Sequence, residues 1–443
     1  MGILKPMLKI NLTNCLSDTI NENGITKREI GAARTEVARA HNELKKAHES
    51  GALGFLDLPF NNDVVNEIQK VAVKVKSKFD NLVVLGIGGS GLGMRCLTQA
   101  LLKPMHNYLT PGERLGHPRI FVCDNIDPYF FNAILKYIDI KKTCFNVISK
   151  SGTTTETISQ FLIIKELLVK HLGFENYRDN LIFTTDPEKG PLRDMAINED
   201  ITAFDVPENI GGRFSALTPV GLFPAAAVGI DIKEMLRGAG DISRSCNTPE
   251  LEKNIVYNLA VVKYLLCKKR QKTISVMMPY ADSLSLFSDW YVQLWAESLG
   301  KEGSGQTPIK AVGATDQHSQ LQLYREGPKD KIITLLGVEK FQDDLQLPLI
   351  REDSSPFKYL SNHMMSHVLK TEQIATTRAL TEAGVPNMTI TLPEVDAYHI
   401  GQLMMVYEVA TAITGSLMNI NPYDQPGVEL GKKLTKEILS KEK

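Results

Sequence analysis

Residues Leu82–Gly93 read LVVLGIGGSGLG, an apolar run that breaks into glycines. A short run rich in β-branched residues, followed by a glycine turn, is typical of a buried strand that leads into a helix. At such a junction the backbone N–H groups and the helix dipole favour an anion. The stretch therefore predicts an α/β fold with a candidate anion site at Gly89 and Ser90, although a tight turn without a ligand would explain the glycines alone.

The same glycines fit the G-x-G-x-x-G pattern of a dinucleotide-binding turn, which is a weak signal by itself. A dinucleotide site needs an acidic residue about 20 positions further on to hold the ribose. Asp124 ends the next strand-like run but lies well beyond that spacing, and no Walker lysine follows the glycines. The nucleotide fingerprint is incomplete, so an NAD(P)-dependent oxidoreductase is an alternative rather than the main hypothesis.

Strand-like runs alternate with helix-length segments along most of the chain. One helix-length segment is Thr155–Leu172, which Gly173 terminates. This alternation predicts two doubly wound, flavodoxin-like parallel sheets in tandem. The predicted strands are Asn81–Gly86, Arg119–Asp124, Phe145–Lys150 and Leu181–Asp186 in the first series, and Thr273–Tyr280, Ile309–Asp316, Lys331–Gly337 and Asn387–Pro393 in the second.

The expected organisation has five parts. Two α/β domains are joined by a linker that contains the GGRF segment, and helical flanks precede and follow them. The corresponding ranges are 1–75 for the N-terminal flank, 76–205 for the first domain, 206–255 for the linker, 256–410 for the second domain and 411–443 for the C-terminal tail. No repeat of fixed period is visible.

The composition is that of an ordinary globular protein. The 443 residues include 50 Lys+Arg and 51 Asp+Glu, and this balance argues against a nucleic-acid-binding protein. The six cysteines are scattered and match no zinc-ligand spacing, as expected in a reducing compartment. Neither a secretory signal nor an apolar run of about 20 residues is present, so we expect a cytoplasmic protein without membrane or metal.

A second loop, SKSGTTT, carries a dense set of hydroxyl groups after the strand-like run FNVI. Helix capping explains one or two serines or threonines at such a junction, but not this number. Hydroxyls and backbone amides at a helix N-terminus suit a phosphate monoester. The loop therefore predicts a phosphate site, with candidate residues Ser149, Lys150, Ser151, Thr153 and Thr154.

Two long segments carry a family resemblance. ENIGGRFSALTPVG (Glu208–Gly221) and GSLMNINPYDQPGVELGK (Gly415–Lys432) are similar to the signatures of the glucose-6-phosphate isomerase family, and WAESLGK and TDQHSQ resemble further family blocks in the expected order. The resemblance spans most of the chain and is closest to the shorter bacterial members. It implies two sugar-isomerase-type domains and reversible conversion of glucose 6-phosphate to fructose 6-phosphate, in glycolysis and gluconeogenesis. It implies no cofactor and no metal.

The resemblance also assigns roles to individual residues. Interconversion of an aldose and a ketose needs a base that moves a proton between adjacent carbons and a donor-rich spot for the enediolate oxygen. Glu297 matches the family base and Arg213 the arginine that steadies the enediolate. His318 and Lys432 match the pair that opens the sugar ring. Two glutamines match residues that contact the sugar or phosphate, namely Gln293 and Gln425.

In the family, the histidine that matches His318 comes from a neighbouring subunit, so the resemblance implies a homodimer. A monomer in which His318 serves its own chain is compatible with the residues alone. The sequence also leaves open a phosphosugar-binding regulator without catalysis, and it leaves open activity on mannose 6-phosphate.

Overall fold

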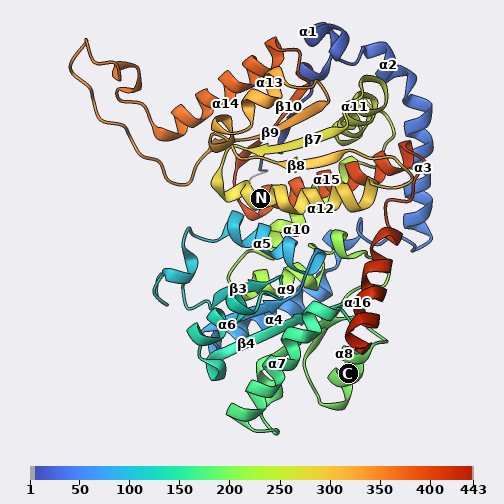
Figure 1. The fold of residues 1–443 in the computed structure, drawn as a ribbon, viewed down its shortest axis with the longest axis vertical. Coiled ribbons are helices and arrows are strands. Elements are labelled where there is room, and N and C mark those ends of the chain that lie inside the picture. Colours follow the sequence, from blue (N-terminus) through green and yellow to red (C-terminus); the bar gives the residue numbers. More distant parts are fainter. Residues whose placement is uncertain (1–4, 442–443) are drawn as a thin grey trace.

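The computed structural model describes residues 5–441 as two stacked halves, each built on one five-stranded sheet (Figure 1). The lower half in this view holds the first sheet, in which all neighbouring strands are parallel. Its order is β3 (Arg119–Cys123), β2 (Asn81–Leu85), β4 (Thr143–Ile148), β5 (Leu181–Thr185) and β6 (Ala203–Asp205). The expected α/β class with two tandem sheets is confirmed.

Helices cover both faces of the first sheet because its strands are apolar on both sides. Leu82 and Val84 face one core, and their neighbours Val83 and Leu85 face another. The first core includes α4 (Asn62–Lys78), α5 (Gly89–Leu101) and α9 (Pro219–Ala227), and the second includes α6 (Pro128–Tyr137), α7 (Thr155–Leu172) and α8 (Pro191–Asn198). Helix α7 has the bounds that the sequence predicts.

The upper half holds the second sheet, whose strands are parallel except at one edge. Its order is β1 (Lys9–Asn11), β10 (Asn387–Glu394), β9 (Lys331–Lys340), β7 (Ile274–Pro279) and β8 (Thr307–Lys310). The exception is β1, which pairs with β10 in antiparallel register. The N-terminal flank thus contributes a strand as well as helices, and three residues are too few to give a period-2 signal.

Strand β8 lies earlier than the expected range of residues 309–316. The sheet pairs Ile274–Met277 with Thr307–Lys310, and residues 315–318 form a 3-10 helix, η9 (Thr315–His318). Pro308 weakens a strand prediction because it cannot donate to the ladder, but β8 is an edge strand, where proline is tolerated. The expected strand range extends too far toward the C-terminus because apolar residues also follow Lys310.

The long helix α15 (Ala397–Leu417) runs through the core of the upper half and is buried over almost its whole length. It crosses α10 (Ile232–Ser245) at very short range. A Cβ on Gly238 would lie 1.9 Å from the Tyr398 carbonyl oxygen, and one on Gly401 would lie 1.9 Å from that of Met235. These two glycines allow the two backbones to touch.

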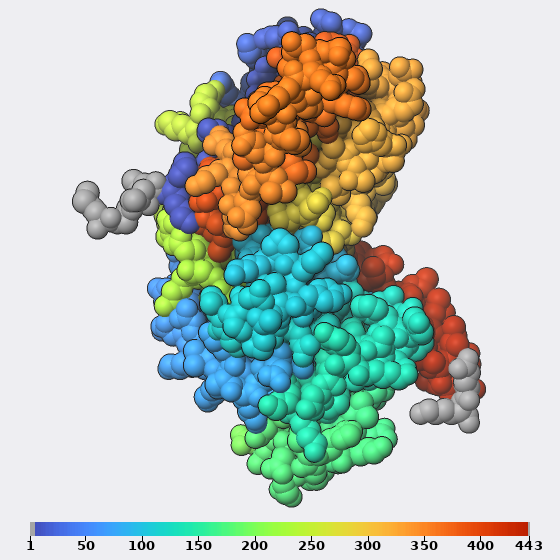
Figure 2. Space-filling model, turned by 90° about the vertical axis from the view of Figure 1, so that its left-hand side faces the viewer, coloured from blue at the N-terminus to red at the C-terminus, as the bar shows by residue number. Residues whose placement is uncertain are grey.

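The remaining helices complete the upper half and join it to the lower one. Helix α12 (Ser285–Leu299) packs against α5 of the lower half, so the two sheets are coupled through this pair. The N-terminal α3 packs against α15, and the C-terminal α16 extends along the lower half (Figures 1 and 2). The other bounds are α1 (Ser17–Ile20), α2 (Lys27–Ala32), α3 (Arg34–Glu49), α11 (Ile255–Arg270), α13 (Leu321–Glu326), α14 (Met365–Glu382) and α16 (Glu429–Lys441).

A long excursion, residues 341–364, leaves the upper half between β9 and α14 (Figure 1). Its regular structure is one 3-10 turn, Lys358–Leu360, and one isolated bridge. Several of its apolar side chains are exposed, including Leu345, Phe357 and Tyr359. None of the helices formed by residues 5–441 has the length and apolar character needed to cross a membrane.

Candidate active site

The glycine loop after β2 is packed against two other segments. Gly88 caps α5 with a positive φ of 58°, and a Cβ there would lie 3.1 Å from Gln293 Nε2 on α12. A Cβ on Gly89 would lie 2.1 Å from the Gly212 carbonyl oxygen. The glycines therefore serve the close approach of the GGRF segment and of α12.

Arg213 is fixed by several acceptors in the interior. Its side chain is only 1% exposed, and its Nε donates to Ser298 Oγ at 2.7 Å. The terminal nitrogens donate to Gln425 Oε1 at 3.1 Å, to the Asp424 carbonyl at 3.0 Å and to the Pro422 carbonyl. Burial lowers the pKa of Arg213, but a guanidinium stays charged near neutral pH.

Glu297 lies beside this guanidinium. One of its carboxylate oxygens is 3.6 Å from Arg213 Nη1, and the other accepts a hydrogen bond of 3.0 Å from Gln293 Nε2. Gln293 and Glu297 lie one turn apart on α12, so the helix presents both to the same side. A half-buried carboxylate next to a fixed cation can take a proton from a carbon acid while the cation stabilises the oxyanion that forms.

The Ser/Thr loop lies at the carboxyl end of β4 and leads into α7. Ser149 and Thr154 share a hydrogen bond of 2.8 Å between their hydroxyls, and Ser151 Oγ accepts from both the amide and the hydroxyl of Thr153. Lys150 Nζ donates to the backbone carbonyls of Glu208 and Ile210, at 2.7 and 2.9 Å. The loop is thereby tied to the segment that contains Arg213, and burial lowers the pKa of Lys150.

A cavity of about 550 Å³ is lined by residues adjacent to Arg213, although neither Arg213 nor Glu297 is among its lining residues. Lys150 and Gly212 line one side, and Gln425 and Tyr423 line the side formed by the C-terminal segment. This volume lies within the range of roughly 300–1,000 Å³ that is usual for small-molecule pockets.

His318 and Lys432 lie apart from this group. His318 ends η9 beyond the edge strand β8, and its ring forms no hydrogen bond with residues 5–441. Lys432 lies on the exposed face of α16 and pairs with Glu429 at 2.7 Å. Within a single chain, the fold assembles Arg213, Glu297, Gln293 and Gln425 but not the expected ring-opening pair.

Two residues at the site were not anticipated from the sequence. Ser298 accepts from Arg213, and Lys301 forms an ion pair of 2.7 Å with Asp424 that fastens the end of α12 to the C-terminal segment. Both belong to the WAESLGK block, and their position next to Glu297 was the available signal. Only the fold reveals that their partners come from residues more than 80 positions away.

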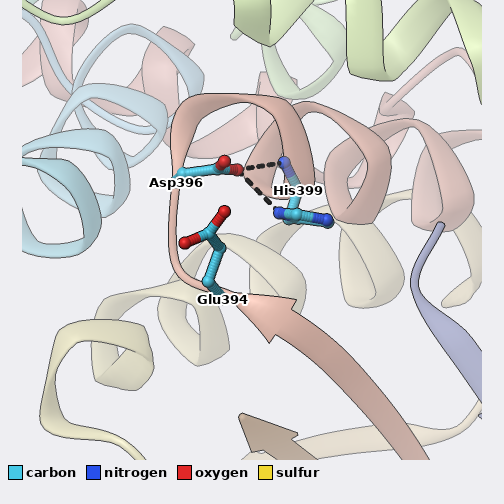
Figure 3. A group of neighbouring side chains, drawn as sticks. All are labelled: Glu394, Asp396 and His399. Carbon is cyan, nitrogen blue, oxygen red and sulfur yellow. Dashed lines mark hydrogen bonds and ion pairs between the residues drawn. The ribbon is translucent and has the colours of Figure 1, made fainter. Parts of the chain in front are cut away.

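The one candidate metal-binding group found among the described residues lies elsewhere. It consists of Glu394 at the end of β10 and Asp396 and His399 at the start of α15 (Figure 3). Asp396 already binds Lys5 Nζ at 2.6 Å and His399 Nδ1 at 2.7 Å, and His399 Nε2 contacts the Pro6 carbonyl at 3.0 Å. The ammonium of Lys5 supplies the cation here, so the group anchors the N-terminal segment.

These features place the protein among two-sheet α/β proteins that hold a small anionic ligand at the carboxyl ends of parallel strands. Residues 63–443 match the phosphoglucose isomerase family. The chain belongs to this family.

Curated relatives and solved structures agree with that assignment. The chain is 43% identical to glucose-6-phosphate isomerase of Carboxydothermus hydrogenoformans, over 98% of this chain and 95% of the relative. It is 45% identical to that of Rubrobacter xylanophilus, over 86% and 88%. Its fold matches a crystal structure of a hypothetical protein from Thermus thermophilus with a TM-score of 0.86, 34% identity and coverage of 98% and 100%. A glucose-6-phosphate isomerase from Chlamydia trachomatis matches with a TM-score of 0.73, 25% identity and coverage of 86% and 73%.

Proposed function

We propose that this chain is an isomerase that interconverts glucose 6-phosphate and fructose 6-phosphate. The observation that carries the proposal is the pairing of Glu297 with the buried guanidinium of Arg213 at 3.6 Å, beside a cavity lined by the phosphate-loop residue Lys150. The family membership and the curated relatives support the same reaction.

In the proposed mechanism, Glu297 removes the proton from C2 of the open-chain aldose and returns it to C1. The carbon–hydrogen bond breaks toward an enediolate, whose negative oxygen faces the Arg213 guanidinium. Gln293 donates to the second carboxylate oxygen and holds the base in place. The product ketose forms when Glu297 returns the same proton, or one exchanged with solvent, to C1, while the proton of the O2 hydroxyl passes to O1 and the C2–O2 bond becomes the carbonyl. No electron leaves the sugar.

We place the phosphate of the substrate at the Ser/Thr loop. Ser149 and Thr154 lie at the N-terminus of α7, where the helix dipole favours an anion. Thr154 is the N-cap residue and makes no capping hydrogen bond with its side chain. Its hydroxyl is paired with that of Ser149 instead, and we propose that both hydroxyls turn to the phosphate when the substrate binds. Gly89, Ser90, Ser151 and Thr153 complete the proposed binding set.

We further propose that the active enzyme is a cytoplasmic homodimer in which the partner contributes the histidine. His318 forms no hydrogen bond with its own chain over residues 5–441, and a ring-opening residue must reach the sugar. The projecting residues 341–364 expose apolar side chains suited to a second copy. The six cysteines are all free, as expected in a reducing compartment.

A coupled assay tests the proposed reaction. Purified protein should form glucose 6-phosphate from fructose 6-phosphate without an added cofactor, and exhaustive chelation should leave the rate unchanged. Absence of glucose 6-phosphate, or loss of activity that added metal restores, would contradict the proposal.

A further inference from the structure

The two sheets repeat one arrangement, although the sequence shows no repeat. Strands β3-β2-β4-β5-β6 of the first sheet correspond in order to β8-β7-β9-β10-β1 of the second. Ligands in open parallel sheets bind beyond the carboxyl ends of the strands. The candidate active site uses this edge of the first sheet. At the same edge of the second sheet lies another cavity, of about 680 Å³, between the two halves.

Helices α5 and α12 occupy equivalent positions after the equivalent strands β2 and β7. Gln99 on α5 lies fourteen residues after the end of β2 at Leu85, and Gln293 on α12 lies fourteen residues after the end of β7 at Pro279. Each glutamine reaches the start of the other helix. Gln293 Nε2 lies against Gly88, and Gln99 Nε2 donates to the carbonyl of Asp282 at 3.1 Å. Gly88 and Asp282 both follow their strands by three residues, so the contacts are reciprocal.

The two cavities differ at the position of the base. Four residues after Gln293 stands Glu297, whereas four residues after Gln99 stands Lys103. The second cavity also contains Lys340, at the end of β9, where the first sheet has the start of its hydroxyl-rich loop. Both lysines are exposed and neither forms an ion pair with any of residues 5–441, although Lys103 Nζ donates to the Glu113 carbonyl at 3.4 Å. The second cavity therefore offers cations where the first offers a base.

The rest of the lining combines apolar side chains, among them Leu102, Met105 and Phe341, with a polar group that suits a polyhydroxylated ligand. Ser283 and Asp282 lie at the start of α12, and Gln342 and Asp343 follow β9. Hydroxyls and amides of this kind donate to and accept from sugar hydroxyls, and the two carboxylates accept from them. We propose that this cavity is a second, non-catalytic site for a phosphorylated sugar, with the phosphate held by Lys103 and Lys340.

Equilibrium dialysis with radiolabelled fructose 6-phosphate tests the proposal, because isomerisation does not change the label count. The wild-type chain is expected to bind two ligands, and the double variant Lys103→Met/Lys340→Met is expected to bind one with kcat and KM unchanged. The matched control Lys74→Met/Lys233→Met removes two exposed lysines elsewhere and should retain two ligands.

The total of two rests on the proposed function, because one of the two ligands occupies the candidate active site. Equal ligand counts for the wild type and the Lys103→Met/Lys340→Met variant would overturn the proposal of a second site. Equal binding of unphosphorylated fructose to the second cavity would overturn the assignment of the lysines to a phosphate. The variant Ser149→Ala/Thr154→Ala should weaken binding at the first site only. The difference in ligand count between the wild type and the Lys103→Met/Lys340→Met variant therefore reports on the second cavity, whereas the coupled assay reports on the proposed isomerase activity.

Discussion

Gly89 is the residue of the glycine loop at which a single added methyl group should affect both stability and activity. An added Cβ would lie 2.1 Å from the Gly212 carbonyl oxygen, and neither backbone can yield without moving the segment that contains Arg213. We expect Gly89→Ala to destabilise the protein by about 1–3 kcal/mol, the usual cost of overpacking, and to abolish most of the isomerase activity. Urea unfolding and kcat measure the two effects.

Gly112→Ala is the matched control, since a Cβ there meets nothing within 4 Å. It should leave both the unfolding free energy and kcat close to wild type. If Gly89→Ala behaved like Gly112→Ala, the close contact between the glycine loop and the GGRF segment would be wrong.

Ser298 should act through Arg213. Ser298→Ala removes the acceptor that Arg213 Nε contacts at 2.7 Å and leaves a buried charged donor unsatisfied, at a cost of about 1–3 kcal/mol. We expect kcat/KM to fall roughly tenfold or more, since a tenfold change corresponds to about 1.4 kcal/mol. The control is Ser304→Ala, at an exposed serine. A Ser298→Ala enzyme with wild-type kcat/KM would contradict the role given to this contact.

At the scale of single residues, the sequence predicts which residues belong to the site better than it predicts which residues they contact. Glu297 and Arg213 were assigned through the family resemblance, because a lone glutamate on a helix has no distinguishing pattern. Their proximity depends on how α12 crosses the first half of the molecule, which no local spacing encodes. The same reason explains why Ser298 and the Lys301–Asp424 ion pair were missed.

At the scale of elements, α11 and α12 enclose a buried lysine that should make the unfolding free energy depend on pH. Lys263 is fully buried, donates to Ser275 Oγ at 2.7 Å and lies over the Trp295 ring. Burial lowers the pKa of Lys263 to about 7. Between that value and the ordinary lysine pKa of about 10.4, the unfolded chain binds more protons than the folded one. The unfolding free energy should therefore rise with pH, by at most about 1.4 kcal/mol per pH unit.

Lys263→Met should remove this rise, because methionine keeps the apolar stem and carries no charge. Urea unfolding at pH 7 and at pH 9 gives the comparison, with the exposed Lys74→Met as control. If wild type and Lys263→Met gained the same stability between the two pH values, the lowered pKa of Lys263 would be refuted.

The long buried elements were predictable and the short edge elements were not. Strands β2 and β4 and helix α7 carry continuous apolar runs, and their ends lie within two residues of the predicted ones. Strands β1 and β6 have three residues each, so they give no periodic signal. The range predicted for β8 lies too far toward the C-terminus, because Pro308 weakens the strand signal and apolar residues follow Lys310.

At the scale of the whole molecule, the proposed dimer predicts that a mixture of two inactive variants regains activity in hybrid dimers. Glu297→Gln lacks the base, and His318→Ala lacks the proposed ring-opening group. After subunit exchange, one of the two sites in each hybrid should combine an intact glutamate with an intact histidine, so the mixture should regain activity. The unmixed variants serve as controls. Verified hybrids without activity, or a monomeric active species, would contradict a shared site.

The correspondence between the two sheets also belongs to the whole molecule and was invisible in the sequence. The loops that follow equivalent strands differ in length and composition. After β4 the chain enters α7 within a few residues, whereas after β9 it runs through residues 341–364 before α14 begins. Strand order and the reciprocal glutamines reveal the repeat, because both depend on contacts between distant segments.

The central claim is that Glu297 moves a proton between C1 and C2 of a bound sugar phosphate. The most direct measurement follows deuterium incorporation into the sugar phosphates by NMR, in D₂O, with wild type and Glu297→Gln. Wild type should introduce solvent deuterium at C2 of glucose 6-phosphate, whereas Glu297→Gln should bind fructose 6-phosphate with nearly unchanged affinity and introduce none. Deuterium incorporation by Glu297→Gln at the wild-type rate would contradict the account.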